Sequence, residues 1–214
     1  NKQNGYLDKA ISEFTSILED RYPELEARQL NFSKDYEVIN ELGQTLFERA
    51  KMERGNDARQ REFLQAAAKR FYDTLAIDSE NVTAHYNLAL IQTSREQHAE
   101  AARAYKEALT VAQEHGLLGI CSPVCMNYGI TLWRLSQFEG AAQMFENTCQ
   151  LALQLGDPLA AGTGKYYRGV MEVKLGRAAE AGAAITEALA LWEGYDVPQA
   201  AQARELLAKL TVGG

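Results

Sequence analysis

A repeat with a step of 40 residues constrains the fold of this chain more than any other feature of its sequence. Small residues recur at this step in the first half of each repeat: Ala89, Gly129 and Gly169. A second set of small residues keeps the same step: Ala101, Ala141 and Ala181. Chance explains two such sets poorly, and periods of about 20 to 50 residues indicate stacked structural units.

The spacing of these small residues predicts pairs of antiparallel helices. Two helices approach closely only where the facing side chains are small, and each small residue marks such a contact. Large residues follow each alanine of the second set by four positions, on the same helical face: Tyr105, Phe145 and Ile185. One pair cannot bury its apolar stripe alone, so neighbouring pairs must stack. The sequence therefore predicts an all-α chain of stacked helix pairs.

The pattern resembles the tetratricopeptide repeat, whose small residues hold the eighth, twentieth and twenty-seventh positions. Ala89 matches the eighth, and Ala101 and Ala108 match the other two. The resemblance implies a right-handed superhelix of antiparallel helix pairs, a solenoid. The usual repeat has about 34 residues. We expect the extra residues here to extend the second helices through 114–116 and 155–158, which is similar to the longer repeats that bind peptides in cell-polarity scaffolds.

The repeat register divides the chain into three parts. Residues 1–80 are predicted to form irregular repeats, with an insertion at 52–61 and with Ser33 capping a helix after a long connection. Residues 81–195 are predicted to form regular repeats. Residues 196–214 are predicted to form a capping helix, with Pro198 in its first turn, and a tail.

The density of charged residues changes along the chain. Residues 1–99 hold 30 charged residues, whereas residues 100–214 hold 21. The first part, through segments 32–36 and 81–87, is similar to repeats attached to bacterial multihaem cytochromes, although the chain has no C-x-x-C-H haem motif. Two interpretations follow. The repeats diverged naturally, or the chain is an engineered fusion of two repeat proteins through a helix near residues 98–116.

The resemblance also implies which residues bind a ligand, because first helices line the concave groove in this family. The implied groove residues are Tyr86, Asn87, Leu90, Met126, Asn127, Ile130, Trp133, Arg134, Tyr166, Tyr167 and Lys174. Asn87 and Asn127 share the sixth position, where an amide pairs with the backbone of an extended peptide. The alternative is that both amides solvate their helices and that the aromatic residues serve ordinary packing.

Charge and motifs narrow the function. The formal net charge is −7, which disfavours nucleic acid and anionic membrane surfaces as partners. Phosphate-binding glycine loops and the G-x-S-x-G and H-E-x-x-H motifs are absent from the sequence, so we expect no enzyme. The chain has three cysteines, of which Cys121 and Cys125 form a C-x3-C pair and Cys149 stands alone. We expect them to be structural thiols, and we expect the protein to bind neither a metal nor a cofactor. The cytoplasm is favoured as compartment, with the periplasm left open.

The leading hypothesis is a scaffold that binds a protein or peptide in the concave groove. The alternative is a structural or assembly protein that self-associates through the exposed faces of its terminal repeats and has no dedicated ligand. The first such face would consist of Leu7, Ile11 and Phe14.

Overall fold

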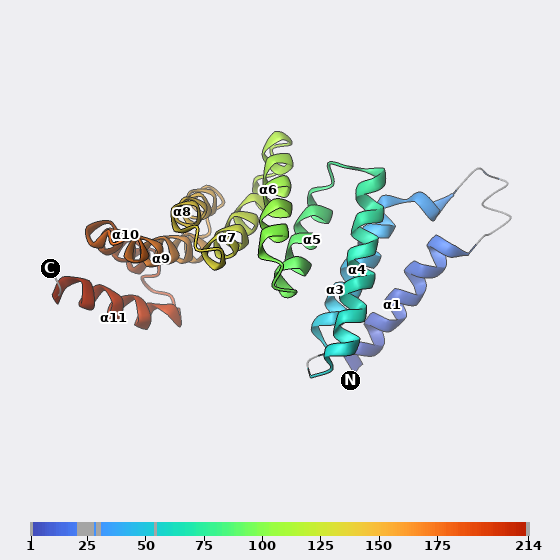
Figure 1. Ribbon diagram of the computed structural model, residues 1–214, viewed down its shortest axis with the longest axis horizontal. Coiled ribbons are helices and arrows are strands. Elements are labelled where there is room, and N and C mark those ends of the chain that lie inside the picture. The colour runs from blue at the N-terminus through green and yellow to red at the C-terminus, as the bar shows by residue number, and fades with distance from the viewer. Residues whose placement is uncertain (1, 21–27, 29–30, 54, 213–214) are drawn as a thin grey trace. The chain divides into compact units, whose positions relative to one another are not determined.

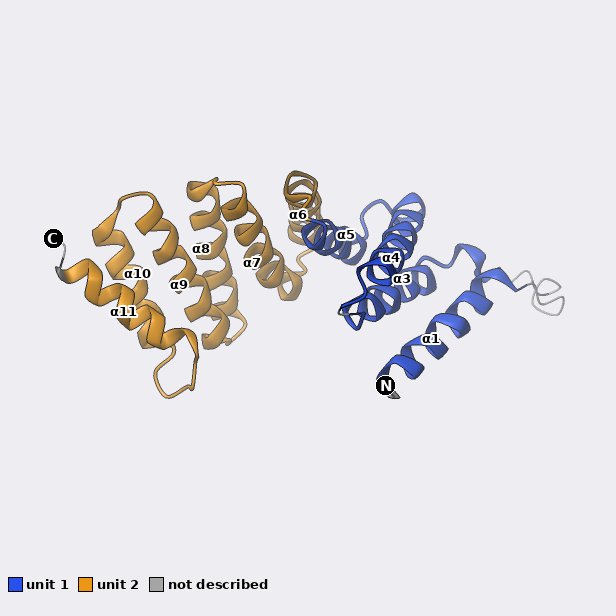
Figure 2. Ribbon diagram, turned by 60° about the horizontal axis from the view of Figure 1, so that its bottom comes forward, with its two compact units in different colours: residues 1–95 blue, residues 96–214 orange. Residues whose placement is uncertain are grey.

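The computed structural model describes residues 2–20, 28, 31–53 and 55–212 (Figure 1). Within these residues the chain forms ten α-helices and one short 3-10 helix, with no strand. The helices divide into two compact units, residues 1–95 and residues 96–214 (Figure 2). The all-α class predicted from the small residues is confirmed.

Unit 1 is built from four α-helices around one core. They are α1 (Lys2–Glu19), α3 (Tyr36–Lys51), α4 (Asp57–Ile77) and α5 (Val82–Ser94), with the 3-10 helix η1 (Phe32–Lys34) before α3. Helices α3 and α4 approach closely, because a β-carbon at Gly43 would lie 2.7 Å from the ring of Phe71. A small residue therefore marks the helix contact in unit 1 as well.

The predicted cap in unit 1 needs correction. Ser33 lies inside η1, and it is Asp35 that caps α3, because its carboxylate accepts the backbone N–H groups of Glu37 and Val38. The predicted connection lies mostly in 21–30, largely outside the described residues. Of the predicted insertion, residues 57–61 form the first turns of α4.

The N-terminal face that we expected to be exposed is covered within unit 1. Ile11 and Phe14 of α1 pack against the core that α3 and α4 form. An ion pair adds to this contact, because Arg49 of α3 donates to Asp8 of α1 at 2.7 Å. The expectation of a free face at these residues is wrong, because α3 supplies the neighbour that the apolar stripe of α1 needs.

Unit 2 is more regular. It comprises α6 (His98–Glu114), α7 (Leu118–Arg134), α8 (Phe138–Gln154), α9 (Pro158–Lys174), α10 (Ala178–Leu191) and α11 (Gln199–Val212). The first four of these each have 17 residues, and turns of three residues join them, so a pair repeats every 40 residues.

The structure corrects where the extra residues of the long repeat lie. The second helices α6 and α8 end at Glu114 and Gln154, and the residues expected to extend them form turns. Relative to the small residue of each repeat, the first helix α7 begins eleven positions before Gly129, whereas α5 begins seven positions before Ala89. The lengthening therefore lies mainly at the start of the first helices.

Packing in unit 2 follows the small residues. A β-carbon at Gly129 would lie 2.7 Å from the Phe145 ring, and one at Gly169 would lie 2.6 Å from Ile185. These contacts join α7 to α8 and α9 to α10, as the 40-residue step predicts. At the C-terminal end, α11 packs on α9 and α10 through a cluster that includes Tyr166 and Trp192.

A residue with left-handed backbone is the middle residue of each three-residue turn from α5 to α10. These residues are spaced by 20: Glu96, Gly116, Ser136, Gly156 and Gly176. Glycine adopts this conformation without strain, and Ser136, with φ 58°, does not share that freedom.

Candidate functional site

An apolar row crosses the first helices α7 and α9 of unit 2. Met126, Ile130 and Trp133 follow one face of α7, and Tyr167 of α9 continues the row. The ring centroids of Trp133 and Tyr167 are 6.2 Å apart. All four side chains are partly exposed and rest on a buried core that includes Phe145. The row is therefore a fixed surface, because its residues are supported from below.

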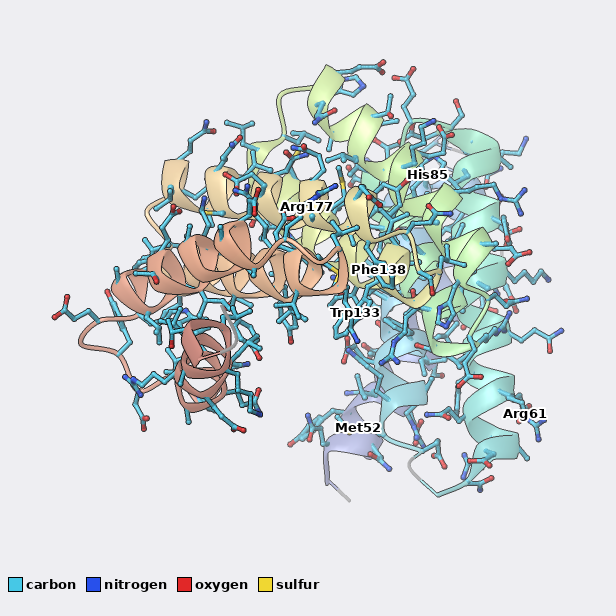
Figure 3. All side chains as sticks on the ribbon, turned by 60° about the vertical axis from the view of Figure 1, so that its left-hand side comes forward. Met52, Arg61, His85, Trp133, Phe138 and Arg177 are labelled. Carbon is cyan, nitrogen blue, oxygen red and sulfur yellow. The ribbon has the colours of Figure 1, made fainter. Side chains whose placement is uncertain are left out.

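The turn after α7 lies at one end of this row. Trp133 lies near the end of α7 and Phe138 begins α8, so the two labelled residues stand on either side of the turn 135–137 (Figure 3). Both belong to the same apolar cluster. The buried residues of this cluster support the Trp133 ring.

Two exposed cations end the helices that carry the row. Arg134 is the last residue of α7 and Lys174 is the last residue of α9, at the same position of successive repeats. Among the described residues neither forms an ion pair. Each cation is favourably placed at a helix C-terminus, where the backbone carbonyls carry partial negative charge.

The two predicted asparagines have different settings. The side chain of Asn127 donates to the carbonyl of Pro123 on its own helix at 3.0 Å, so part of its hydrogen-bonding capacity is used locally. Asn87 lies on α5 in unit 1 and is only 8% exposed. Its helix also carries Tyr86, which is partly exposed, and Leu90, which packs against the core of unit 1.

Tyr166 is part of the interior rather than of the exposed row. Its ring packs on Trp192 with centroids 5.9 Å apart, and its hydroxyl donates to Gln202 of α11 at 3.4 Å. Burial raises the pKa of this phenol. Tyr166 therefore joins α9 to α11, and it is unavailable to a ligand while α11 is packed.

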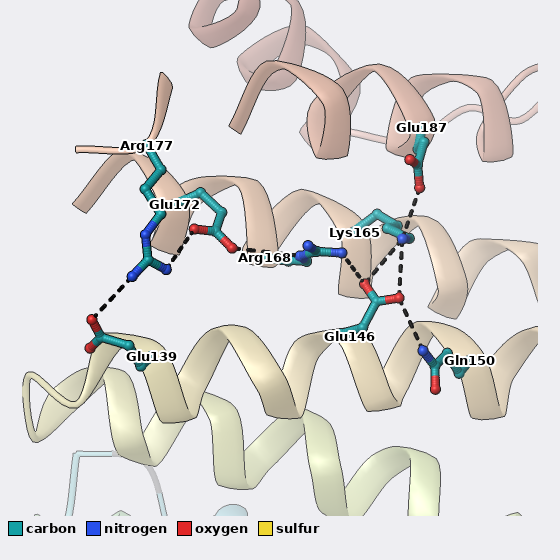
Figure 4. Close-up of polar contacts among 8 residues, drawn as sticks. All are labelled: Glu139, Glu146, Gln150, Lys165, Arg168, Glu172, Arg177 and Glu187. Carbon is teal, nitrogen blue, oxygen red and sulfur yellow. Dashed lines mark hydrogen bonds and ion pairs between the residues drawn. The ribbon is translucent and has the colours of Figure 1, made fainter. Parts of the chain in front are cut away.

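A chain of ion pairs lies between the second helices α8 and α10 (Figure 4). Glu146 of α8 accepts from Lys165 at 3.0 Å and from Arg168 at 2.6 Å, both on α9. Lys165 also reaches Glu187 of α10 at 2.8 Å. The chain continues to Glu172 through Arg168 and ends in a pair between Arg177 and Glu139.

The ion pairs keep their charges despite partial burial. Burial alone would raise the pKa of Glu146, but the hydrogen bonds from Lys165 and Arg168 outweigh it and lower that pKa. For Lys165, burial opposes the charge, and the bonds to Glu187 and Glu146 raise its pKa overall. Glu146 and Lys165 are therefore both charged near neutral pH.

A pocket of about 410 Å³ opens beside these ion pairs. Its lining comes from α8, α9 and α10: Glu146, Cys149, Gln150, Leu153, Lys165, Glu187, Ala190 and Leu191. Burial raises the pKa of the Cys149 thiol, so the thiol stays protonated. Our sequence reasoning missed this pocket. A comparison at the 40-residue step would have pointed to it, because Lys165 stands where Cys125 stands one repeat earlier.

Two further features of the described residues bear on function. No helix among them is long and apolar enough to cross a membrane. Within the same residues, no group of three or more His, Cys, Asp or Glu side chains could hold a metal ion.

The fold and these surfaces define an all-α helical-repeat protein of the tetratricopeptide-repeat-like solenoid type. Residues 82–115 match the family described as "Tetratricopeptide repeat". This segment contains α5 and α6 and covers one repeat.

Solved structures with the same fold span nearly the whole chain. A MamA crystal structure shares 16% identity at a TM-score of 0.65, covering 90% of this chain and 92% of MamA. BtubC from P. vanneervenii shares 18% identity at 0.66, covering 96% and 83%. The apo form of RapI shares 12% identity at 0.63, covering 97% and 71%. No curated protein sequence matches the chain.

Proposed function

We propose that the chain is a non-enzymatic scaffold that holds a peptide segment of a partner protein across α7 and α9. The observation that carries the proposal is the supported apolar row of Met126, Ile130, Trp133 and Tyr167, which ends at exposed cations. Repeat proteins of the tetratricopeptide kind typically mediate protein interactions, which supports this reading. Tryptophan and tyrosine are also enriched among the residues that dominate binding energy.

The charges favour one class of partner. Arg134 and Lys174 are exposed and unpaired among the described residues, in a chain whose formal net charge is −7. A segment with apolar anchors followed by acidic residues would complement both features. We include Asn127 in this surface, because it lies between Met126 and Ile130 on α7.

The remaining groove residues are assigned differently. Tyr86, Asn87 and Leu90 belong to α5 in unit 1, and their part in binding stays a prediction. We leave out Tyr166, because it is buried against α11.

A peptide selection tests the proposal. A library of random twelve-residue peptides, displayed on phage, is panned against the full chain, and selected peptides are measured by fluorescence anisotropy. We expect peptides in which acidic residues adjoin apolar ones. Trp133→Ala should weaken their binding by about tenfold or more, as is usual for a central aromatic anchor.

A charge-matched control separates the surface from general electrostatics. Arg134→Ala with Lys174→Ala should weaken binding, whereas Lys106→Ala with Arg204→Ala removes the same charge elsewhere on unit 2 and should not. Selection of peptides without acidic residues, or equal losses in both double variants, would argue against the acidic partner. If Trp133→Ala binds the selected peptides with unchanged affinity, the assignment of this surface is wrong.

A second candidate function, assembly through self-association, is favoured by one observation. The large apolar side chains of unit 2 that are most exposed lie in or near the turns after its second helices: Leu117, Leu118, Leu153, Leu155, Leu159 and Tyr195. Such residues can cover one another between copies. Light scattering tests this, since a chain that stays monomeric at millimolar concentration would exclude it. A concentration-dependent mass that Leu155→Ser abolishes would support it.

The interpretation as a fusion of two repeat proteins also stays a proposal. It is supported by the boundary between units at residues 95 and 96, which lies close to the change in charge density. Separate homologue searches with the two units test it. Two unrelated parents would support the fusion, and one shared parent would exclude it.

A further inference from the structure

We propose that the pocket between α8 and α10 binds an aliphatic organic cation, a primary ammonium or guanidinium group carried on an alkyl chain. The pocket measures about 410 Å³, within the range of small-molecule sites. Its walls are mainly apolar, from Leu153, Ala190 and Leu191, and its polar groups gather around Lys165. The pocket lies apart from the apolar row on α7 and α9, so it does not depend on the peptide-binding proposal.

The pocket is particular to this repeat and is not a general consequence of stacking. One repeat earlier, the position of Lys165 is taken by Cys125 and that of Cys149 by Leu109, and both are buried. The smaller Cys149 leaves space that a leucine would fill. Packing alone therefore does not require a lysine here, and burying a charge beside carboxylates is costly unless it is well paired.

The hydrogen-bond donors and acceptors that line the pocket indicate the charge of its ligand. An ammonium group has three donors. Those of Lys165 face three carboxylate oxygens within 3.2 Å, two of Glu146 and one of Glu187. Gln150 donates its amide to Glu146 at 3.2 Å. The donors of Lys165 and Gln150 are therefore largely engaged.

The acceptors are not exhausted. The second carboxylate oxygen of Glu187 and the amide oxygen of Gln150 have no hydrogen-bond partner among the described residues (Figure 4). Both residues are exposed at the mouth of the pocket. A ligand that reaches these two atoms must donate hydrogen bonds to them.

The local charge agrees with this inventory. Glu146 is shared between Lys165 and Arg168, whereas Glu187 pairs with Lys165 alone and is exposed. A carboxylate ligand would meet the exposed carboxylate of Glu187 and few free donors. An ammonium or guanidinium group would pair with Glu187, while its alkyl chain covers Leu153 and Leu191.

Titration of the full chain with n-hexylammonium, followed by amide chemical shifts in NMR spectra, tests the proposal. We expect saturable shifts of Cys149, Gln150 and Ala190, and no saturable shifts with hexanoate, which has the same chain length and the opposite charge. Methylammonium, which lacks the apolar chain, should bind at least tenfold more weakly than n-hexylammonium. Equal or tighter binding of hexanoate would overturn the proposal.

Two variants locate the site. Glu187→Gln should weaken n-hexylammonium binding about fivefold or more, while Glu180→Gln, on the first turn of the same helix, should not. Ala190→Leu narrows the pocket without changing charge and should also weaken binding. Since both 187 and 190 are exposed positions, these variants should fold. Unaltered affinity in both would overturn the assignment.

The ammonium group could belong to a lysine side chain of a protein or to a small metabolite, and a further binding measurement distinguishes the two. A capped pentapeptide with one central lysine is compared with n-hexylammonium. Tighter binding of the peptide identifies a lysine side chain of a protein as the occupant, and tighter binding of the free amine identifies a small metabolite. The absence of saturable shifts from both would overturn the proposal.

Discussion

Replacement of Gly129 by alanine should destabilise unit 2, although alanine is normally the better helix former. The added β-carbon would lie 2.7, 2.9 and 3.1 Å from three atoms of the Phe145 ring. That ring cannot retreat freely, because it is fully buried and stacks on Tyr167 with centroids 5.3 Å apart. Overpacking of this kind costs about 1–3 kcal/mol.

The helical preference for alanine offsets part of this cost, by about 0.5–1 kcal/mol. We therefore expect a net loss of about 1–2 kcal/mol. In urea this corresponds to a midpoint lower by roughly 0.5–1 M. The assay is tryptophan fluorescence, which reports on unit 2 alone, since the chain has two tryptophans, Trp133 and Trp192, and both lie in that unit.

Two comparisons decide whether the contact is the cause. Gly119→Ala, on the same helix, meets no atom within 4 Å, so it should leave the midpoint unchanged or raise it. In a Phe145→Leu background, where the ring is gone, Gly129→Ala should cost little, giving a coupling of about 1 kcal/mol or more. A Gly129→Ala protein as stable as the parent would refute the packing argument.

The remaining predictions concern charge, backbone and thiols. Because the folded pKa of Glu146 is lowered, the stability that it provides is complete above its ordinary value near 4.5 and is lost as the pH falls below it. Glu146→Gln should flatten this acid dependence in urea titrations between pH 6 and 3, and an equally steep dependence would exclude the role. Ser136→Gly should raise the free energy of unfolding by about 0.5–1 kcal/mol, because glycine adopts the left-handed backbone without strain. Gly156→Ala should lower it by about 1 kcal/mol for the same reason. Thermal melts in which the two melting temperatures do not shift in opposite directions would contradict this. The pKa of Cys125 is raised to about 12, first by burial and then by Cys121, so iodoacetamide at pH 8 should label the native thiol far more slowly than the unfolded one, as mass spectrometry would measure.

The sequence predicted the helix pairs well, because small residues at a fixed step have one physical meaning. Gly129 and Gly169 lie against Phe145 and Ile185, which the sequence places on the helical face of the second set of small residues. Local polar details were predicted less well. A hydroxyl and a carboxylate can both cap a helix, and the sequence alone does not show that the cap is Asp35 and not Ser33.

The binding surface was predicted less well, because the sequence does not show which neighbouring helices cover each residue. The family register places Tyr166 beside Tyr167, but only the position of α11 shows that Tyr166 is covered. The pocket was missed for a similar reason. Glu146, Lys165 and Glu187 come from three helices, and their pairing depends on packing that the spacing within one helix does not contain.

The ion pairs between α8, α9 and α10 also bear on how this chain tolerates gain or loss of repeats. Helices α6 to α9 are equal in length, and so are the turns that join them. Removal of residues 118–157 would therefore join α6 to α9 through a turn of unchanged length. The backbone would accept this deletion. The charges would not, because Lys106 holds the position on α6 that Glu146 holds on α8, and it would then face Lys165 and Arg168. The repeats of unit 2 therefore match in backbone length but differ in the charges that they present to their neighbours.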